Sequence, residues 1–344
     1  MLYPIELRAH LHYHPNAKKL AWQGFKFPVI MEARSLKEAF MAPIMEDSIP
    51  TEGQGAKIIL GEPVQKGYFY GYEGIVIHEE GGEQAIMIME NPFWGRILFI
   101  NGTLQFTSRD EFIYHEALVH IPIQAFPEGK VKRVLICGGG DFGAAREVLK
   151  YPEVEEVLIA DIDPRVPRVV KEFFPGLLPE NPEDSRLKLL TVDAFKLVED
   201  LVSQDQTFDL VIIDSTDPDI SVSDFTLELS HSLFSKDFHR LLLKLAPKGA
   251  IVQQAATPFT MKNILEGSYN IFTQVYPENE VFCYRASVPS FGGDNAYVLR
   301  FPEGNPAAPR KKSIPQTKYY THEVHRASFA LPKFWLTEVL NRYE

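Results

Sequence analysis

The sequence predicts an α/β fold in which a doubly wound sheet follows a small N-terminal antiparallel β domain. The first observation is a period-two alternation of apolar and polar residues over 68–107, which is typical of short antiparallel strands. The second begins at residue 133, where short apolar runs alternate with segments of helical periodicity. Continuous apolar strands that alternate with helices indicate a parallel sheet covered on both faces.

The order of these elements divides the 344 residues into four parts. Residues 1–65 form an N-terminal extension of unknown role, and 66–125 form the β-strand domain with a linking helix. Residues 126–302 form the α/β domain, and 303–344 form a C-terminal connection with a short final segment. In the α/β domain we expect strands at 133–137, 155–161, 187–192, 208–214 and 249–254, helices at 144–151, 167–174, 194–202, 236–246 and 259–275, and a closing β pair at 278–286 and 295–301.

The composition is that of an ordinary globular protein, with 45% hydrophobic and 24% charged residues. The formal net charge of −11 disfavours nucleic acid and anionic lipid as partners, because phosphate binding requires a face rich in Lys and Arg. No apolar run approaches the length of a membrane span, and the first residues lack the pattern of a signal peptide. Cys137 and Cys283 lie in separate apolar runs, so we expect a reducing compartment and a cytoplasmic protein.

A glycine-rich turn follows the first strand of the α/β domain. The stretch VLICGGGDFG places Gly138, Gly140 and Gly143 in the G-x-G-x-x-G arrangement between a strand and a helix. Without Cβ atoms, such a turn can pack closely against a nucleoside or dinucleotide, which predicts a Rossmann-like domain. The turn alone does not separate NAD enzymes from enzymes of the S-adenosylmethionine type, and a tight turn can require glycine for its own sake.

Carboxylates follow four successive strands of this domain. Asp141 lies inside the glycine turn, Asp161 ends the second strand at the usual place for binding ribose hydroxyls, and Asp193 ends the third. Asp214 and Asp217 follow the fourth strand, although an Asp before proline can also cap a turn. Asp141 would repel a pyrophosphate, which disfavours NAD. We therefore expect a crevice for a cationic nucleoside without phosphate.

At these residues the chain resembles the spermidine synthase family, the polyamine aminopropyltransferases. The resemblance extends from about residue 70 to 301 and is carried by NGTLQFTSRDEFIYHEALVHIP, RVLICGGGDFGAAREVLKYPEVEEV, IDSTDP and VPSFGG. The stretch YYTHEVHRASFALPKF is similar to the end of bacterial members. The resemblance implies a methyltransferase-type Rossmann-like sheet and transfer of the aminopropyl group of decarboxylated S-adenosylmethionine to an amine, usually putrescine. The products are spermidine and methylthioadenosine.

The resemblance also implies the roles of individual residues. Asp214 looks like the catalytic acid that accepts a proton from the attacking amine. The resemblance implies neither a metal nor a prosthetic group, and decarboxylated S-adenosylmethionine is a co-substrate. This assignment suits the chemistry, since a protonated amine must lose a proton before it can attack and the sulfonium leaves as a neutral thioether. The implied substrate-binding residues are Gln84, Gln105, Tyr114, His115, Gly138, Gly140, Asp141, Asp161, Asp193, Ala194, Asp217, Gln254 and Phe291.

The chain departs from the family pattern at two places. Residues 219–231, DISVSDFTLELSH, stand where members usually have a short Gly-Pro loop, so we expect a longer lid over the substrate. Phe291 stands where many members have a tyrosine, so a hydroxyl contact to the amine site is lost. Both features are similar to those of a branch of the family whose relatives carry membrane segments. This sequence shows no such membrane segment.

The sequence thus predicts a polyamine aminopropyltransferase with small-molecule amine and nucleoside substrates and with neither nucleic acid nor membrane as a partner. The resemblance implies a homodimer or a higher homo-oligomer. Two alternatives stay open, an S-adenosylmethionine-dependent methyltransferase on the same fold and a family member that keeps the pocket without catalysis. Without the resemblance, Tyr114 and His115 are equally well explained as packed residues of a helix.

Overall fold

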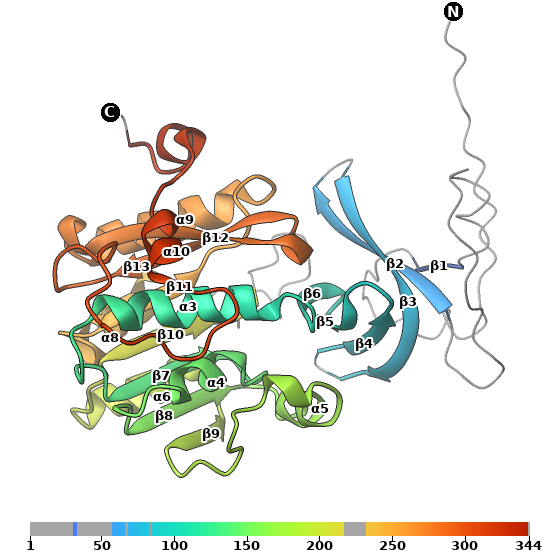
Figure 1. Cartoon of the computed structure of the whole chain (residues 1–344), viewed down its shortest axis with the longest axis horizontal. Coiled ribbons are helices and arrows are strands. Elements are labelled where there is room, and N and C mark those ends of the chain that lie inside the picture. Colours follow the sequence, from blue (N-terminus) through green and yellow to red (C-terminus); the bar gives the residue numbers. More distant parts are fainter. Residues whose placement is uncertain (1–29, 33–56, 66–67, 83, 217–231, 343–344) are drawn as a thin grey trace, which may run out of the picture.

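The computed structural model describes residues 30–32, 57–65, 68–82, 84–216 and 232–342. Within them the chain forms two sheets that are joined by one long helix, α3 (Figure 1). The sheet formed first along the chain is small and antiparallel, and the second is a larger mixed sheet with helices on both faces. The predicted combination of a Rossmann-like α/β sheet with a small antiparallel β domain is confirmed.

The smaller sheet contains six strands in sequence order, and every neighbouring pair is antiparallel. The sequence predicts an extension over residues 1–65, but two segments of it pair with the sheet as strands β1 and β2. The second of these contains both Gly61 and Pro63, residues that are depleted in strands, which weakens its sequence signal. The strands are β1 (Ile30–Glu32), β2 (Lys57–Gln65), β3 (Tyr68–Glu80), β4 (Ile86–Asn91), β5 (Gly95–Ile100) and β6 (Thr103–Thr107).

The larger sheet contains seven strands in the order β12-β13-β11-β10-β7-β8-β9. The five strands from β11 to β9 run parallel, whereas β13 pairs antiparallel with both β11 and β12. This arrangement places the carboxyl ends of β7, β8, β9 and β10 along one edge. The strands are β7 (Arg133–Gly138), β8 (Glu156–Asp161), β9 (Leu187–Thr191), β10 (Leu210–Asp214), β11 (Ala250–Gln254), β12 (Val281–Val288) and β13 (Gly293–Arg300).

Alternate residues of the central strand β7 enter two separate hydrophobic cores. Val134 and Ile136 pack in a core with residues of α3, α4 and α5, whereas Leu135 and Cys137 pack in a core with residues of α6, α8 and α9. Helices thus cover both faces, as the doubly wound prediction requires. The helices are α3 (Glu111–Ala125), α4 (Gly143–Leu149), α5 (Arg165–Phe173), α6 (Ala194–Ser203), α8 (Lys236–Leu245), α9 (Lys262–Val275) and α10 (His322–Ser328).

Helix α3 is buried on almost every side. Of its residues only Phe112 and Ile113 are partly exposed, so the linking helix is a core element. The buried hydroxyl of Tyr284 in β12 donates a hydrogen bond to the carbonyl of Ala117 at 3.1 Å. These contacts hold the helix against one face of the larger sheet.

A buried carboxylate of α3 binds the backbone of the C-terminal segment. Glu116 is 1% exposed and accepts hydrogen bonds from the backbone N–H groups of Lys318, Tyr319 and Tyr320 at 2.7, 2.8 and 2.7 Å. Three N–H donors compensate the burial of this charge, which would otherwise be costly. The segment before α10 is therefore part of the structure that surrounds α3.

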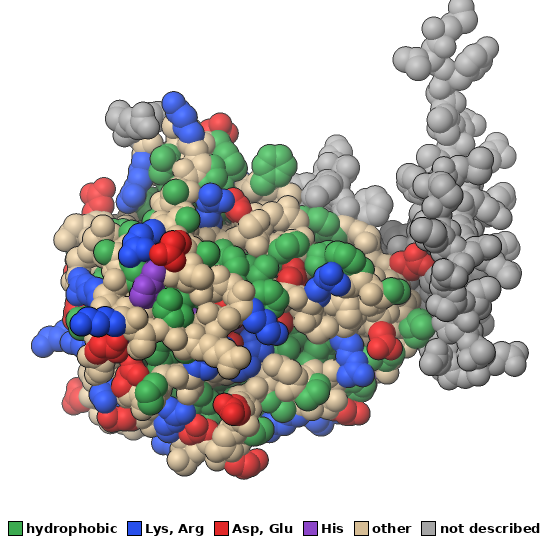
Figure 2. Space-filling model, in the orientation of Figure 1, with side chains coloured by type: hydrophobic (Ala, Val, Ile, Leu, Met, Phe, Trp, Pro, Cys, Tyr) green, Lys and Arg blue, Asp and Glu red, His purple; other side chains and the backbone are tan. Residues whose placement is uncertain are grey.

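The surface of the α/β part carries both signs of charge. On the face shown in Figure 2, Lys and Arg side chains are interspersed with Asp and Glu rather than gathered into a region of one sign. In the described part of the chain, no helix combines the length and the apolar character that crossing a membrane requires.

Candidate active site

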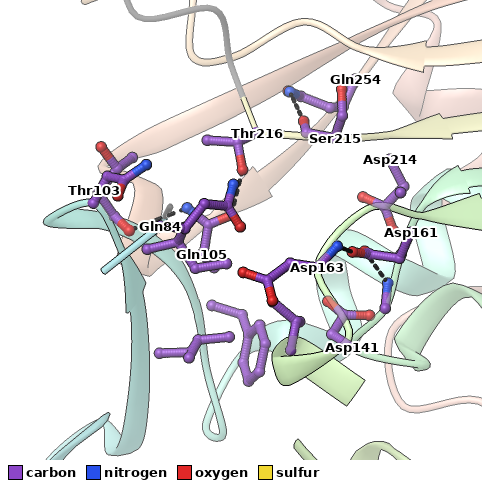
Figure 3. A pocket seen from close by; sticks show the side chains of 18 of the residues that line it. Gln84, Thr103, Gln105, Asp141, Asp161, Asp163, Asp214, Ser215, Thr216 and Gln254 are labelled. Atoms are coloured by element: carbon purple, nitrogen blue, oxygen red, sulfur yellow. Dashed lines mark hydrogen bonds between the residues drawn. The ribbon is translucent and has the colours of Figure 1, made fainter. Parts of the chain in front are cut away.

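A cavity of about 500 Å³ lies between the two sheets, at the carboxyl ends of the parallel strands. One wall comes from the glycine turn and from the residues that end β8 and β10, and the opposite wall comes from β3, β5 and β6. Figure 3 shows both sides, with Asp141, Asp161 and Asp214 facing Gln84 and Gln105 across the space. This is the position at which ligands bind in open α/β sheets.

The glycine turn itself lies in close contact with two of the predicted acids, Asp214 and Asp161. Gly138 has a φ of +83°, and a Cβ atom there would lie 2.1 Å from the carbonyl oxygen of Asp214. A Cβ atom on Gly140 would lie 2.6 Å from Oδ2 of Asp161, and the N–H of Gly140 donates a hydrogen bond to that oxygen at 2.9 Å. Both glycines are therefore required for the close approach of backbone and carboxylates.

Asp214 ends β10 with one carboxylate oxygen engaged and the other without a partner. Oδ1 accepts a hydrogen bond from the hydroxyl of Tyr114 at 2.6 Å, whereas the buried Oδ2 has no hydrogen-bond partner among the described residues. Burial and the neighbouring charge of Asp141 raise the pKa of Asp214 to about 6, although His115 and the bond from Tyr114 act in the opposite direction. A carboxylate of this pKa can accept a proton near neutral pH.

His115 lies one layer behind the cavity wall rather than at its surface. Its side chain is 1% exposed, with Nδ1 2.7 Å from Oε2 of Glu111 and Nε2 3.4 Å from Oδ2 of Asp141. Burial alone would lower the pKa of His115, but the charges and hydrogen bonds of Asp141 and Glu111 raise it to about 10. The ring therefore carries a positive charge at neutral pH.

A second ion pair fixes the carboxylate that holds His115. Burial would raise the pKa of Glu111, but His115 and Arg146 together lower it to about 2. Arg146 donates to both oxygens of Glu111 at 2.9 Å, and its Nε donates to the buried Glu147 at 2.8 Å. A row of alternating charges thus extends from the core to Asp141.

In the described part of the chain, the same cluster contains the group of side chains whose spacing could hold a metal ion. One side-chain atom from each of His115, Asp141 and Asp214 lies within 4.8 Å of the other two. An imidazole binds a metal through a lone pair, which the doubly protonated His115 lacks. One cation and two carboxylates therefore suit an incoming ammonium group better than a metal ion.

A further part of the cavity wall contains Asp161, which ends β8, and Asp193, which caps α6. Backbone N–H groups of Gly140 and Asp163 donate to Asp161 at 2.9 Å each, and burial with the charges of Asp141 and Asp163 raises the pKa of Asp161 to about 6. Asp193 caps α6 by accepting from the N–H of Phe195 at 2.8 Å. Asp193 and the following Ala194 both line the cavity. The side chain of Asp193 therefore combines its capping role with the predicted role in binding.

The predicted glutamines differ in how they are held. Oε1 of Gln105 accepts from the hydroxyl of Thr216 at 3.0 Å, which connects β6 to the segment after β10 (Figure 3). The side-chain amide of Gln254 donates to the carbonyl of Ser215 and accepts from the N–H of Ala256, both at 3.0 Å. Gln254 therefore connects the end of β11 to the segment after β10. Gln84 lines the cavity on the side of the smaller sheet.

Phe291 lines the cavity with a tyrosine beside it that the sequence analysis did not identify. The ring of Phe291 packs edge-on against Tyr114 with 5.7 Å between centroids. Its carbonyl accepts a hydrogen bond from the hydroxyl of Tyr70 in β3 at 3.0 Å. Tyr70 therefore supplies a hydroxyl to this wall from the smaller sheet. The two residues are 221 positions apart, so no local pattern indicates this contact.

Apart from His115, the predicted site residues in the described part of the chain all line this one cavity. Asp217 and the predicted lid at 219–231 lie outside the described residues. Further cavity residues without a prediction include Tyr70, Thr103, Asp163, Arg165, Thr216, Thr257, Met261, Ser290 and Asn295.

Comparisons with known proteins identify the family of this chain. Residues 111–303 match the spermine/spermidine synthase domain. A polyamine aminopropyltransferase from Thermoanaerobacter sp. (strain X514) is 36% identical over 263 residues, which cover 75% of this chain and 89% of the relative. A spermidine synthase from Dictyostelium discoideum is 32% identical over 268 residues, which cover 76% of this chain and 89% of the relative.

Solved structures show the same architecture. A crystal structure of spermidine synthase in complex with the transition-state analogue AdoDATO superposes with a TM-score of 0.72 at 27% identity, covering 86% of this chain and 98% of that chain. The spermidine synthase from Thermotoga maritima gives a TM-score of 0.71 at 26% identity, with 87% and 98% covered. The chain belongs to the spermine/spermidine synthase family.

Proposed function

We propose that the protein transfers the aminopropyl group of decarboxylated S-adenosylmethionine to putrescine or a similar amine, which yields spermidine and methylthioadenosine. The observation that carries this proposal is Oδ2 of Asp214, which has no hydrogen-bond partner within the described part of the chain and lies in a cavity wall with further acids. The names of the relatives and the analogue bound by one structural neighbour support the same reaction.

In this reaction Asp214 first attracts the protonated amine and then takes one proton from it. An N–H bond of the ammonium breaks and an O–H bond forms on Asp214. The freed lone pair attacks the aminopropyl carbon attached to sulfur, and the electrons of the C–S bond return to the sulfonium. Methylthioadenosine leaves as a neutral thioether, and the new secondary amine carries the positive charge.

The other cavity residues orient these reactants. Tyr114, which donates to Oδ1 of Asp214 at 2.6 Å, keeps the carboxylate plane fixed so that Oδ2 faces the amine. Asp141 is held between the charged His115 and the N–H of Gly143, 2.8 Å away, and attracts the ammonium of the aminopropyl chain. Asp161 binds the ribose hydroxyls. The reaction then depends on nitrogen, carbon and sulfur being held in line.

An S-adenosylmethionine-dependent methyltransferase is the alternative on the same fold. S-adenosylmethionine carries a carboxylate where the decarboxylated substrate has only an aminopropyl chain, and Asp141 and Asp214 would repel that carboxylate. We expect calorimetry to show tighter binding of decarboxylated S-adenosylmethionine than of S-adenosylmethionine. The opposite order of affinities would favour the methyltransferase.

The direct test is incubation with decarboxylated S-adenosylmethionine and a panel of putrescine, cadaverine, agmatine and spermidine, with products identified by mass spectrometry. The variant Asp214→Asn should lower kcat by about 10²–10⁴-fold, the usual contribution of a general base. Its binding of methylthioadenosine should stay close to that of the wild type. Asp200→Asn, on the exposed side of α6, is the matched control and should leave kcat unchanged. Equal turnover by Asp214→Asn and the wild type would remove Asp214 as the base, whereas bound substrates without any product would favour a non-catalytic family member.

The assembly and the compartment belong to the same proposal. We expect a homodimer or a higher homo-oligomer, and light scattering coupled to size-exclusion chromatography measures its mass directly. A cytoplasmic location is supported by the two buried free cysteines, Cys137 and Cys283, which a reducing compartment keeps as thiols.

A further inference from the structure

One guanidinium group connects the two sheets at the nucleoside end of the cavity. Arg165 is the first residue of α5, and it lines the cavity together with Gln84. Its Nη1 donates a hydrogen bond to the carbonyl of Gly81 at 2.9 Å, and its Nη2 donates to the carbonyl of Gln84 at 3.0 Å. These two carbonyls belong to the connection between β3 and β4, so the α/β part holds a turn of the smaller sheet directly.

The same guanidinium is fixed from behind by a carboxylate. Nε and Nη2 of Arg165 donate to the two oxygens of Asp163 at 2.8 and 2.6 Å, and Asp163 is 7% exposed. The N–H of Asp163 in turn donates to Asp161, the acid assigned to the ribose, at 2.9 Å. A continuous path of charge-assisted hydrogen bonds therefore leads from Asp161 through Arg165 to the turn that carries Gln84.

The guanidinium of Arg165 contacts this turn at three of its described residues, Gly81, Gly82 and Gln84. A Cβ atom on Gly82 would lie 2.1 Å from Nη1 of Arg165, so the backbone passes directly against the guanidinium. A Cβ atom on Gly81 would meet nothing within 4 Å. Two successive glycines lose much conformational entropy when they are ordered, and no side chain of theirs repays it by packing. Arg165 supplies the ordering contacts instead.

We propose that Arg165 is a positioning residue for the nucleoside substrate, which holds the β3–β4 turn and Gln84 in place against the nucleoside end of the cavity. This inference rests on the proposed function, because it assigns that end to the nucleoside. The contacts lie away from Asp214 and are the same before and during the transfer. Their loss therefore weakens binding of substrate and transition state equally, which raises KM and leaves kcat unchanged.

A second ion pair between the same two elements provides the matched control. Arg168, one turn further along α5, contacts Glu80 at the end of β3. Its side chain is 51% exposed and does not line the cavity. Arg168→Ala removes a link between α5 and β3 without changing the turn at Gln84. The two arginines therefore separate positioning of the nucleoside from general attachment of the sheets.

The experiment measures binding of methylthioadenosine by calorimetry, together with kcat and the KM values of both substrates. Arg165→Ala should raise the Kd of methylthioadenosine and the KM of decarboxylated S-adenosylmethionine by about 10- to 100-fold, since several hydrogen bonds to a charged group are lost. The KM of the amine and kcat should stay within about threefold of the wild type, and Arg165→Lys should recover part of the affinity. Arg168→Ala should match the wild type.

Two further measurements keep the outcomes distinct. Exchange of the Ala85 amide, whose N–H donates to Asn101 at 2.8 Å, should be faster in Arg165→Ala even without ligand, because the adjoining turn is released.

The double variant Asp163→Asn/Arg165→Ala removes the carboxylate that the single variant would leave unpaired, and its affinity for methylthioadenosine should be as low as that of Arg165→Ala. Wild-type affinity in both variants, or a fall in kcat alone, would overturn the role of Arg165. A wild-type protein that binds no methylthioadenosine would instead overturn the proposed function.

Discussion

Replacing Tyr114 with Phe tests how the structure sets the basicity of Asp214. The hydroxyl donates to Oδ1 at 2.6 Å and stabilises the charged form of the carboxylate, so its loss raises the pKa of Asp214. Among the described residues, the groups that act on Asp214 include Tyr114 and His115 from α3, Asp141 from the glycine turn, Asp161 from β8 and Tyr297 from β13. Only the first of these changes in the variant.

The size of the effect follows from the strength of one bond. A hydrogen bond to a charged group contributes roughly 1.5 kcal/mol at the low end of its range, and 1.36 kcal/mol corresponds to one pH unit in a pKa. The pKa of Asp214 should therefore rise from about 6 to about 7. A base must be deprotonated to act, so the acid limb of the pH profile moves to higher pH. At pH about 6.5 the active fraction falls by about threefold, whereas at pH about 9 it is the same in both proteins.

The assay is kcat/KM between pH about 5 and 9, measured for the wild type, Tyr114→Phe and a control. Tyr151→Phe removes another buried hydroxyl, which lies 2.8 Å from His120 and outside the cavity, and it should leave the acid limb in place. Asp161 also titrates near pH 6, but Tyr114 does not contact it, so the difference between the two profiles isolates Asp214. An acid limb that stays at the same pH in Tyr114→Phe would refute the reasoning.

Two further predictions concern the turn and the charge network. Gly138→Ala should abolish binding of methylthioadenosine and lower the free energy of unfolding by more than about 2 kcal/mol, because the new Cβ atom would lie 2.1 Å from the backbone of Asp214 at a positive φ. Arg146→Met should lower the free energy of unfolding at neutral pH by about 3–5 kcal/mol in urea titrations, because Glu111 and Glu147 would be left buried with part of their charge uncompensated.

Each of these changes has a control in the same protein. Gly129 has a φ of +70° but nothing within 4 Å of an added Cβ atom, so Gly129→Ala reports the cost of the backbone conformation without the clash. The exposed pair of Arg240 and Asp237 should contribute less than about 1 kcal/mol, so Arg240→Met should be nearly neutral. Equal losses in control and test variants would contradict the assigned causes.

The positions of the acids could be predicted because they depend on local sequence. An apolar run that ends in Asp161 or Asp214 defines both the strand and the residue at its end, and parallel strands bring these ends to one edge. The glycine turn between them is equally local. Element boundaries therefore agree to within a few residues in this part of the chain.

The contacts between the sheets could not be predicted, because they join residues that are far apart in the sequence. The hydrogen bond from Arg165 to Gln84 joins residues that are 81 positions apart in the sequence, and the one from Tyr70 to Phe291 joins residues that are 221 positions apart. The spacing of Asp163 and Arg165 does indicate a local ion pair, but it does not indicate which turn the guanidinium reaches. His115 was assigned to the substrate from its motif, whereas only the packing of α3 places it behind Asp141.

The attachment of the C-terminal segment to α3 has a consequence for biosynthesis. Glu116 lies next to His115 in the chain, yet its N–H donors, beginning with Lys318, are translated 202 residues later. At about 5–20 residues per second the ribosome needs roughly 10–40 s to supply them. Until then the helix that carries Tyr114 cannot bury this carboxylate without a large penalty. In a nascent chain, the three N–H donors that compensate the burial of Glu116 are therefore absent until residues 318–320 have been added.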